Sequence, residues 1–291
     1  MLSVTCLERH RPDCVLRLIS NMLSPLRTSL VVPCYNEANR LDVDRFRSFL
    51  QATASVHLIF VNDGSSDTTV TMLNLLCRGF ADRSTILSYP ENKGKAEAVR
   101  FGVNHALGQI RTEIVGFWDA DLATPFEELD SLLEVFVQRP DIQMVFGARV
   151  KLLGRKVVRI SGRHYLGRVF ATFVSQMLGI PIYDTQCGAK LFRVSQHLRR
   201  AFELPFLSRW VFDVEIIARF LQMYSEDRRN LANAIYECPL STWIDVAGSK
   251  VRPKHFFIAF LDVLRIMRQL PKRIEPSKSV EVEKALGARS Q

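Results

Sequence analysis

The chain has 291 residues, of which 47% are hydrophobic and 24% are charged, and its formal net charge is +9. These values are ordinary for a folded protein with a large core, and they exclude a disordered or fibrous chain. The six cysteines lie far apart, without a C-x-x-C pair or zinc-ligand spacing, so neither a disulfide framework nor a structural metal is expected. Charged residues interrupt the first 27 positions and no apolar run reaches the roughly 18 residues of a membrane span, which predicts a cytoplasmic protein.

The positive charge suits an anionic partner, either a phosphorylated small molecule or an anionic membrane surface. Nucleic acid is not expected, because the aromatic residues that accompany the basic ones fall at helical spacing more than in alternating strands. Charge does not distinguish between the two remaining partners, so that choice depends on the motifs.

Strands and helices alternate from residue 27 to about residue 120. The run VHLIFV over residues 56–61 is apolar throughout, as in a parallel strand that is buried on both faces. The first strand, over residues 30–32, is expected to stop at Pro33, because proline lacks the N–H group that the next ladder position needs. The alternation predicts an α/β fold with a mostly parallel central sheet flanked by helices. The other expected elements are strands over 85–88 and 114–118 and helices over 43–53, 67–77 and 95–107.

The second half is less regular, with a strand expected over residues 144–150 and amphipathic helices over 166–178 and 257–267. The apolar stripes of these two helices either pack against the sheet or lie in a membrane interface, as peripheral contact on the cytoplasmic face. Residues 271–291 are expected to form a flexible basic tail. The second stripe consists of Phe257, Phe260, Leu261, Leu264 and Met267. The cationic rim of an interfacial pair would be Arg163, Arg168, Arg265, Arg268, Lys272 and Arg273.

Three polar motifs each follow a predicted parallel strand: P-C-Y-N-E at 33–37, N-D-G-S at 62–65 and D-A-D at 119–121. Each motif alone has a plainer interpretation, since N-D-G-S is good turn chemistry and D-x-D is often a solvated loop. The carboxyl ends of parallel strands meet at one edge of the sheet, so the three motifs are expected to share one crevice. Asp119 and Asp121 would repel each other there unless a cation lay between them, which predicts Mg²⁺ or Mn²⁺ with open positions for phosphate oxygens and water.

Further stretches are E-N-K-G-K-A-E-A-V-R-F-G-V at 91–103, G-A-R at 147–149, D-T-Q-C-G-A-K-L-F at 184–192, R-W-V-F-D-V-E-I-I at 209–217 and G-S-K at 248–250. With these, the sequence over residues 28–270 resembles the inverting family 2 glycosyltransferases of the GT-A fold. Within that family it resembles the polyprenol-phosphate (dolichyl-phosphate) glucosyl- and mannosyltransferases. The signature that begins at Asp184 is typical of the dolichyl-phosphate glucosyltransferase branch.

The resemblance implies a Rossmann-like, single GT-A catalytic domain over residues 28–270. Its nucleotide-sugar-binding half would cover 28–123 and its acceptor half 124–250, with an amphipathic helix over 251–270. The implied reaction moves a hexose from a UDP- or GDP-hexose, with glucose from UDP-glucose as the expected case, onto polyprenyl or dolichyl phosphate.

The resemblance also implies roles for individual residues, with Asp63 accepting a hydrogen bond from the nucleotide base. The implied nucleotide-sugar site is Pro33, Tyr35, Glu37, Asp63, Lys95, Asp119, Ala120 and Asp121. The implied metal ligands are Asp119 and Asp121. The candidates for the acceptor phosphate are Arg149, Lys190, Arg209 and Lys250, and the candidates for catalysis are Asp121, Arg149 and Asp213.

The nature of the acceptor stays open. A hydroxyl acceptor would need a base, for which Asp213 is the candidate, whereas a phosphate acceptor is already anionic and needs none. The plainer alternatives are that Asp213 pairs with Arg209 or Arg219 and that Lys190 forms a surface ion pair. A third hypothesis is a nucleotide-sugar-binding protein that has lost activity.

Three departures from the family pattern bear on these expectations. Ala123 stands where mannosyl-phosphate synthases often carry a metal-binding glutamine, and Ala189 stands where the signature usually has phenylalanine. The amino-terminal membrane anchor of the branch is not expected in this sequence. Membrane contact would then come from the amphipathic helices.

Overall fold

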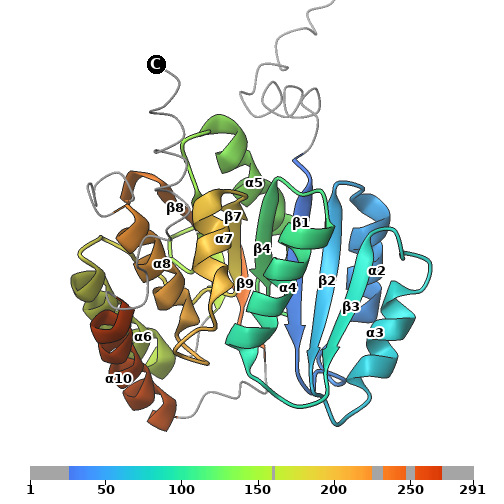
Figure 1. Cartoon of the computed structure of the whole chain (residues 1–291), viewed down its shortest axis with the longest axis horizontal. Helices are drawn as coiled ribbons and strands as arrows, with labels where there is room; N and C mark the ends of the chain where they lie inside the picture. Colours follow the sequence, from blue (N-terminus) through green and yellow to red (C-terminus); the bar gives the residue numbers. More distant parts are fainter. Residues whose placement is uncertain (1–25, 159–160, 225–231, 247–252, 271–291) are drawn as a thin grey trace, which may run out of the picture.

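The computed structural model describes residues 26–158, 161–224, 232–246 and 253–270. In Figure 1 a central sheet crosses the molecule, with helices on both faces. The amino-terminal 25 residues, Lys250 and the predicted tail over 271–291 lie outside the described residues.

The central sheet has seven strands in the order β3-β2-β1-β4-β7-β5-β8. Only β7 runs antiparallel to its neighbours β4 and β5, and the other pairs are parallel, as predicted. A separate two-stranded sheet joins β6 and β9. The strands are β1 (Thr28–Cys34), β2 (Val56–Asp63), β3 (Ser84–Tyr89), β4 (Ile114–Trp118), β5 (Met144–Ala148), β6 (Lys156–Val158), β7 (Ala189–Arg193), β8 (Ile235–Pro239) and β9 (Thr242–Ile244).

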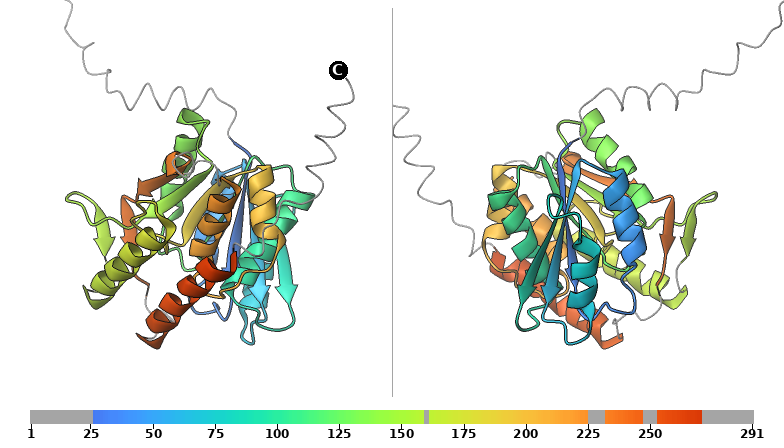
Figure 2. Two further views of the ribbon diagram at one scale, coloured as in Figure 1. Left: turned by 60° about the vertical axis from the view of Figure 1, so that its left-hand side comes forward. Right: turned by 90° about the vertical axis from the view of Figure 1, so that its right-hand side faces the viewer.

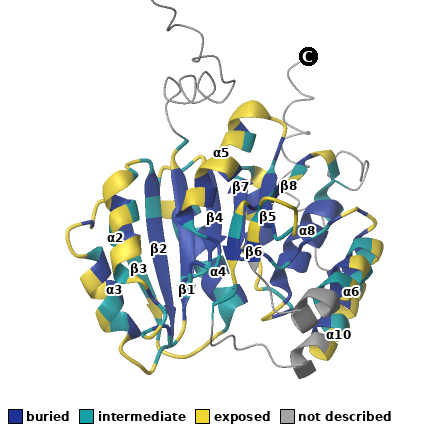
Figure 3. Ribbon diagram, turned by 180° about the vertical axis from the view of Figure 1, so that it is seen from behind, coloured by how far each residue is buried: buried dark blue, intermediate teal, exposed yellow. Residues whose placement is uncertain are grey.

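Helices cover the sheet on two sides, and each side has its own apolar core. Val31 and Ile59 point to the core shared with α4, α6, α7, α8 and α10, whereas Leu30, Val32 and Leu58 point to the core shared with α2, α3 and α5. Figure 3 shows the sheet buried between these layers. The helices are α2 (Val43–Ala52), α3 (Thr69–Cys77), α4 (Lys95–Gln109), η1 (Phe126–Glu128), α5 (Leu129–Gln138), α6 (Ser161–Leu178), α7 (Gln196–Glu203), α8 (Phe212–Met223) and α10 (Pro253–Gln269).

The first strand does not stop at Pro33, as its sequence suggested. β1 continues through Pro33 to Cys34, with Pro33 beside Val61 of β2. On its other edge β1 pairs with β4 only as far as Val31, so a proline beyond that point interrupts no bond to β4. The P-C-Y-N-E motif therefore begins inside the strand and leaves the sheet after Cys34.

The two amphipathic helices pack against each other, and Figure 2 shows α6 and α10 side by side. Phe260 of α10 contacts the rings of Phe170 and Phe173 of α6, with centroids 5.4 and 4.9 Å apart. Both helices also reach the apolar core, so the interpretation that their apolar stripes pack inward is confirmed for most of the α6 stripe and only in part for that of α10. None of the helices that the structure describes is long and apolar enough to span a bilayer.

The stripe predicted for α10 is only partly the one that packs inward. The buried side chains of α10 are Ala259, Val263 and Ile266, and Phe260 and Met267 are partly buried. The other predicted members face outward: Phe257 is 69% exposed, Leu261 51% and Leu264 41%. Helix α10 therefore carries apolar side chains on two sides; on the side that the described residues leave exposed, they lie among Arg265 and Arg268.

Candidate active site

A cavity of about 610 Å³ opens at the carboxyl ends of β1, β2 and β4. These strands are neighbours in the sheet, which is why three motifs far apart in the sequence meet at one edge. The structure thus brings most of the predicted site together. The predicted residues that line the cavity are Pro33, Tyr35, Glu37, Asp63, Lys95, Asp119, Ala120, Asp121, Arg149, Arg209 and Asp213.

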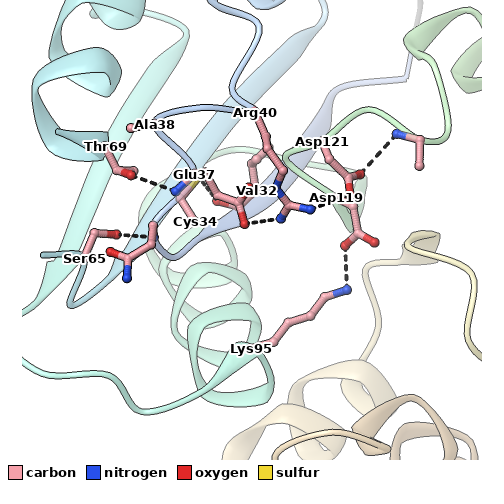
Figure 4. Close-up of polar contacts among 12 residues, drawn as sticks. Val32, Cys34, Glu37, Ala38, Arg40, Ser65, Thr69, Lys95, Asp119 and Asp121 are labelled. Carbon is pink, nitrogen blue, oxygen red and sulfur yellow. Dashed lines mark hydrogen bonds and ion pairs between the residues drawn. The ribbon is translucent and has the colours of Figure 1, made fainter. Parts of the chain in front are cut away.

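The D-A-D motif follows β4 directly, and both of its carboxylates face basic side chains (Figure 4). Lys95, the first residue of α4, places its Nζ 2.5 Å from Oδ1 of Asp119. Arg40 places Nη1 3.5 Å from Oδ2 of Asp121. The N–H of Ala123 donates to Oδ1 of Asp121 across 3.1 Å, which holds that carboxylate in the turn.

The charges of Asp119 and Asp121 favour the binding of a cation at this edge of the sheet. Burial and the nearby charge of Asp119 raise the pKa of Asp121 above its ordinary value. Burial opposes the charged form of Lys95, but the carboxylates of Asp119 and Asp213 outweigh it and raise the pKa of Lys95. The two aspartates are thus held close together in a partly desolvated site, where additional positive charge would be favourable.

The donor set suits a divalent cation that takes most of its ligands from elsewhere. Among the described residues no group of three His, Cys, Asp or Glu side chains could hold a metal. Two adjacent carboxylates match Mg²⁺ or Mn²⁺ that keeps positions open for diphosphate oxygens and water. Asp119 and Asp121 are therefore the residues that would hold such an ion.

Glu37 lines the cavity and forms an ion pair with a nearby arginine. Its carboxylate accepts two hydrogen bonds from Arg40, one from Nε at 2.7 Å and one from Nη2 at 2.6 Å. Its own N–H donates to the hydroxyl of Thr69. Glu37 thereby orients Arg40 toward Asp121, and Arg40 is a cavity residue that sequence reasoning missed, although its spacing of three from Glu37 was a signal.

Asp63 is 2% exposed and anchors the segment that precedes α4. Oδ1 accepts from the N–H of Lys93 at 2.7 Å, and Oδ2 accepts from the N–H of Gly94 at 2.8 Å. The side-chain amide of Asn92 also donates to Oδ2, at 2.9 Å. Asp63 therefore ties the tip of β2 to the start of α4, on which Lys95 lies.

The far side of the cavity carries arginines beside aromatic rings. Arg149 forms a two-pronged ion pair with Asp184, with both contacts at 2.7 Å, and its guanidinium lies 5.3 Å from the centroid of Trp243. Burial opposes the charged form of Arg149, but the carboxylate of Asp184 outweighs this effect, so the pKa of Arg149 lies above its ordinary value. Arg168 of α6 lies 3.6 Å from the ring centroid of Tyr183. The apolar side chains of Phe170, Ala171 and Ala259 also line the cavity.

Lys190 is not a surface residue, so the alternative of a surface ion pair is wrong. It is 1% exposed and points from β7 into the protein, where its Nζ lies 2.7 Å from Oδ1 of Asp213 and donates to the carbonyl of Cys187. It does not line the cavity, which places it beneath the site rather than in it.

The partners proposed for Asp213 are also wrong. Arg219 pairs with Glu215 instead, at 2.6 Å, and Arg209 hydrogen-bonds to Asn92 and Lys93. Asp213 itself is 6% exposed at the start of α8, and its buried partner is Lys190. Burial raises the pKa of Asp213, and Lys190 and Lys95 only partly oppose this effect.

The segment between α6 and β7 contributes residues to which sequence reasoning assigned no role. Asp184 orients Arg149, and the amide of Gln186 lies 3.4 Å from Asp213. The signal was present, because both belong to the D-T-Q-C-G signature. Trp210 and Trp243 also line the cavity; Trp210 belongs to the R-W-V-F-D-V-E-I-I motif, whereas no motif singled out Trp243.

Comparisons with known proteins agree with this geometry. The family model of glycosyl transferase family 2 matches residues 29–198. Dolichyl-phosphate beta-glucosyltransferase of Dictyostelium discoideum is 30% identical over 260 residues, which cover 84% of this chain and 75% of that protein. The Mus musculus protein of the same name is 32% identical over 241 residues, which cover 77% of this chain and 69% of that protein.

A solved structure shares the fold. Glucosyl-3-phosphoglycerate synthase from Mycobacterium tuberculosis, in complex with Mn²⁺ and UDP-glucose, matches with a TM-score of 0.62 and 18% identity. The match covers 92% of this chain and 86% of that one. The fold expected from the sequence is thus confirmed. From the family match and the similarity to these relatives, the chain belongs to family 2 of the glycosyltransferases.

Proposed function

We propose that this protein transfers glucose, with inversion, from UDP-glucose to the phosphate of a polyprenyl phosphate such as dolichyl phosphate. The observation that carries the proposal is the lining of one cavity, which combines the carboxylate pair Asp119 and Asp121, the arginines Arg149 and Arg168, and apolar side chains of α6 and α10. The relatives named above, which are dolichyl-phosphate beta-glucosyltransferases, support the same reaction. The complex of the solved neighbour with Mn²⁺ and UDP-glucose supports the donor.

The donor would lie over the ends of β1, β2 and β4, in the part of the cavity lined by Tyr35, Asp63 and Lys95. Pro33, Glu37 and Ala120 complete the proposed nucleotide-sugar site, Glu37 through its hold on Arg40. A divalent cation held by Asp119 and Asp121 would neutralise charge on the diphosphate. Lys95 and Arg40 are the chain's own cations beside that position, so they would help to stabilise the departing UDP.

The acceptor would enter from the side of α6 and α10. Asp184 holds the guanidinium of Arg149 through Nε and Nη2, so Arg149 would meet the acceptor phosphate with its Nη1 side. Arg168 lines the same part of the cavity, and the apolar wall of Phe170 and Ala259 suits the first isoprene units of the lipid. Because a phosphate monoester is already anionic at neutral pH, these groups need only position it in line with the sugar carbon.

A hydroxyl acceptor is the second candidate, and one observation favours it. Asp213 lines the cavity, and burial raises its pKa, as is common for a general base. Its ion pair with Lys190 favours the charged form that a base needs. The acceptor itself therefore has to be tested.

We propose further that the protein contacts a membrane through the uncovered face of α10. Phe257, Ile258, Leu261 and Leu264 are exposed there. Arg265 and Arg268 are exposed on the same helix and could meet anionic lipid headgroups. Helix α10 borders the cavity through Ala259 on its buried side, so docking of its exposed side on a membrane would bring the cavity close to the bilayer.

The decisive experiment is incubation of the full chain with labelled UDP-glucose, Mn²⁺ and a short polyprenyl phosphate. The expected product is a glucosylated lipid that extracts into organic solvent and is cleaved by mild acid. A panel of UDP- and GDP-sugars with Mg²⁺ in place of Mn²⁺ identifies the preferred donor and ion. Transfer to a soluble saccharide or a glycolipid hydroxyl, with none to the polyprenyl phosphate, would contradict the proposal.

A further inference from the structure

Arg209 lies on the acceptor side of the chain but makes its contacts on the donor side. It belongs to the segment between α7 and α8, and its exposed side chain crosses to the segment just before α4. Its Nε donates to the carbonyl of Lys93 at 3.0 Å. Its Nη2 donates to the side-chain oxygen of Asn92 at 2.9 Å and to the carbonyl of the same residue at 3.2 Å.

Asn92 connects Arg209 to Asp63, which belongs to the proposed nucleotide-sugar site. While its side-chain oxygen accepts from Arg209, its side-chain nitrogen donates to Oδ2 of Asp63 at 2.9 Å. The next two residues, Lys93 and Gly94, donate their N–H groups to the same carboxylate. Arg209, Asn92 and Asp63 thus form one chain of hydrogen bonds, from the edge of the cavity to the tip of β2.

Gly94 lets the arginine approach this closely. Its φ is +96°, and a Cβ at this position would stand 2.7 Å from Nε of Arg209. The same glycine is the N-cap of α4, and Lys95, which pairs with Asp119, follows it. The segment that Arg209 grips therefore sets the positions of both Asp63 and Lys95.

The segment that carries Arg209 is itself firmly held. The hydroxyl of Ser208 donates to Asp262 of α10 at 2.6 Å, and the N–H of Leu207 donates to Glu215 at 2.7 Å. Arg219 donates to the carbonyls of Leu204 and Pro205. Because the backbone around Arg209 is already fixed, less conformational entropy is lost when Arg209 holds the 92–94 segment in place.

We infer that Arg209 is a positioning residue of the donor pocket, which acts through Asn92 on Asp63, and that it is not a ligand of the acceptor phosphate. Its hydrogen bonds order the 92–94 segment before the donor arrives. Without them, part of the binding free energy of the nucleotide would be used to order that segment. The inference rests on the proposed nucleotide-sugar donor, but not on the nature of the acceptor.

The first test measures donor and acceptor affinity separately in Arg209→Ala. We expect the Kd for UDP with Mn²⁺, measured by calorimetry on the full chain, to rise about five- to twentyfold, because hydrogen bonds from a charged donor are lost. The KM for polyprenyl phosphate should change less than about twofold, because the acceptor does not contact Arg209 in this inference, whereas kcat should fall, because the same segment positions Lys95. Arg209→Lys should recover only part of the affinity, since one ammonium cannot reproduce the guanidinium fork.

Arg111→Ala is the matched control, since Arg111 is exposed in the loop between α4 and β4, at the opposite ends of the strands. It should leave all three constants unchanged. An Arg209→Ala protein with unchanged UDP affinity and a raised KM for polyprenyl phosphate would overturn the inference, because Arg209 would then bind the acceptor. Unchanged constants throughout would overturn it equally.

The second test needs no ligand and no turnover. Asp63 protects the amide protons of Lys93 and Gly94, so hydrogen exchange at these two positions should become faster in Arg209→Ala while exchange in β1 and β2 stays the same. Exchange at wild-type rates would refute the positioning role whatever the donor. Failure of the proposed function is recognised separately, by a wild-type protein that forms no lipid-linked glucose.

Discussion

Gly188 lies directly against the carboxylate of Asp119, so that a Cβ on Gly188 would stand 1.9 Å from Oδ2 of Asp119. The backbone of the two residues is joined as well, since the N–H of Asp119 donates to the carbonyl of Gly188 at 3.1 Å. The carboxylate of Asp119, the first aspartate of the D-A-D motif, therefore packs against Gly188, the glycine of the D-T-Q-C-G signature. Any side chain at position 188 has to displace that carboxylate.

Gly188→Ala should lower kcat strongly, because the alanine methyl group pushes Asp119 away from its position beside Lys95. A displacement of about 1 Å at a reacting centre costs on the order of a hundredfold in rate. Steady-state kinetics with UDP-glucose and polyprenyl phosphate measures the effect. Gly108→Ala is the control, since a Cβ there meets nothing within 4 Å, and it should retain full activity.

Asp121→Asn should raise the Mn²⁺ concentration needed for half-maximal activity by more than about tenfold, because one of two charged ligands is lost. The measurement is a Mn²⁺ titration of turnover after chelation of bound metal. Asp141→Asn, on an exposed aspartate paired with Arg139, provides the control and should not shift the titration. If the wild-type enzyme keeps full activity in excess chelator, the metal site is wrong.

Lys190→Met should destabilise the protein, because it leaves the carboxylate of Asp213 buried without its partner. Removing one member of a buried ion pair typically costs about 3–5 kcal/mol. Urea denaturation measures the loss. The double variant Lys190→Met/Asp213→Asn should recover part of it, and equal stability of the single and double variants would show that the pair is not coupled.

Asp213→Asn distinguishes between the two acceptor chemistries. With a phosphate acceptor, turnover per folded molecule should fall less than about tenfold, since no proton has to be removed. With a hydroxyl acceptor, loss of the base should cost on the order of a hundredfold or more. Turnover has to be normalised to the folded fraction, because this variant also disturbs the ion pair with Lys190.

Replacing Leu261 and Leu264 of α10 with aspartate should weaken binding to vesicles that contain anionic lipid and polyprenyl phosphate. Both side chains are exposed, so the fold should survive. Vesicle co-sedimentation measures binding, and circular dichroism checks the fold. Leu75→Asp, on the exposed face of α3, is the matched control; a loss of vesicle binding equal to that of the α10 variant would argue against a specific membrane face.

The sequence by itself determined the α/β fold and the place of the site, because local patterns encode both. The buried run over 56–61 and the alternation of strands and helices indicate a parallel sheet. Parallel strands bring their carboxyl ends to one edge of the sheet, which places the polar motifs together. The D-A-D motif could be placed beside the other two for the same reason. Family motifs then narrowed the chemistry further.

Only the tertiary structure decided what individual charged side chains do. Lys190 looked like a surface or phosphate-binding lysine, but β7 enters the sheet between β4 and β5 and carries it into the core. Arg209 was expected at the acceptor phosphate, yet it reaches residues 92 and 93, more than a hundred positions earlier. Such partners are set by contacts between segments distant in the chain, and no spacing rule within the sequence encodes the distance between them.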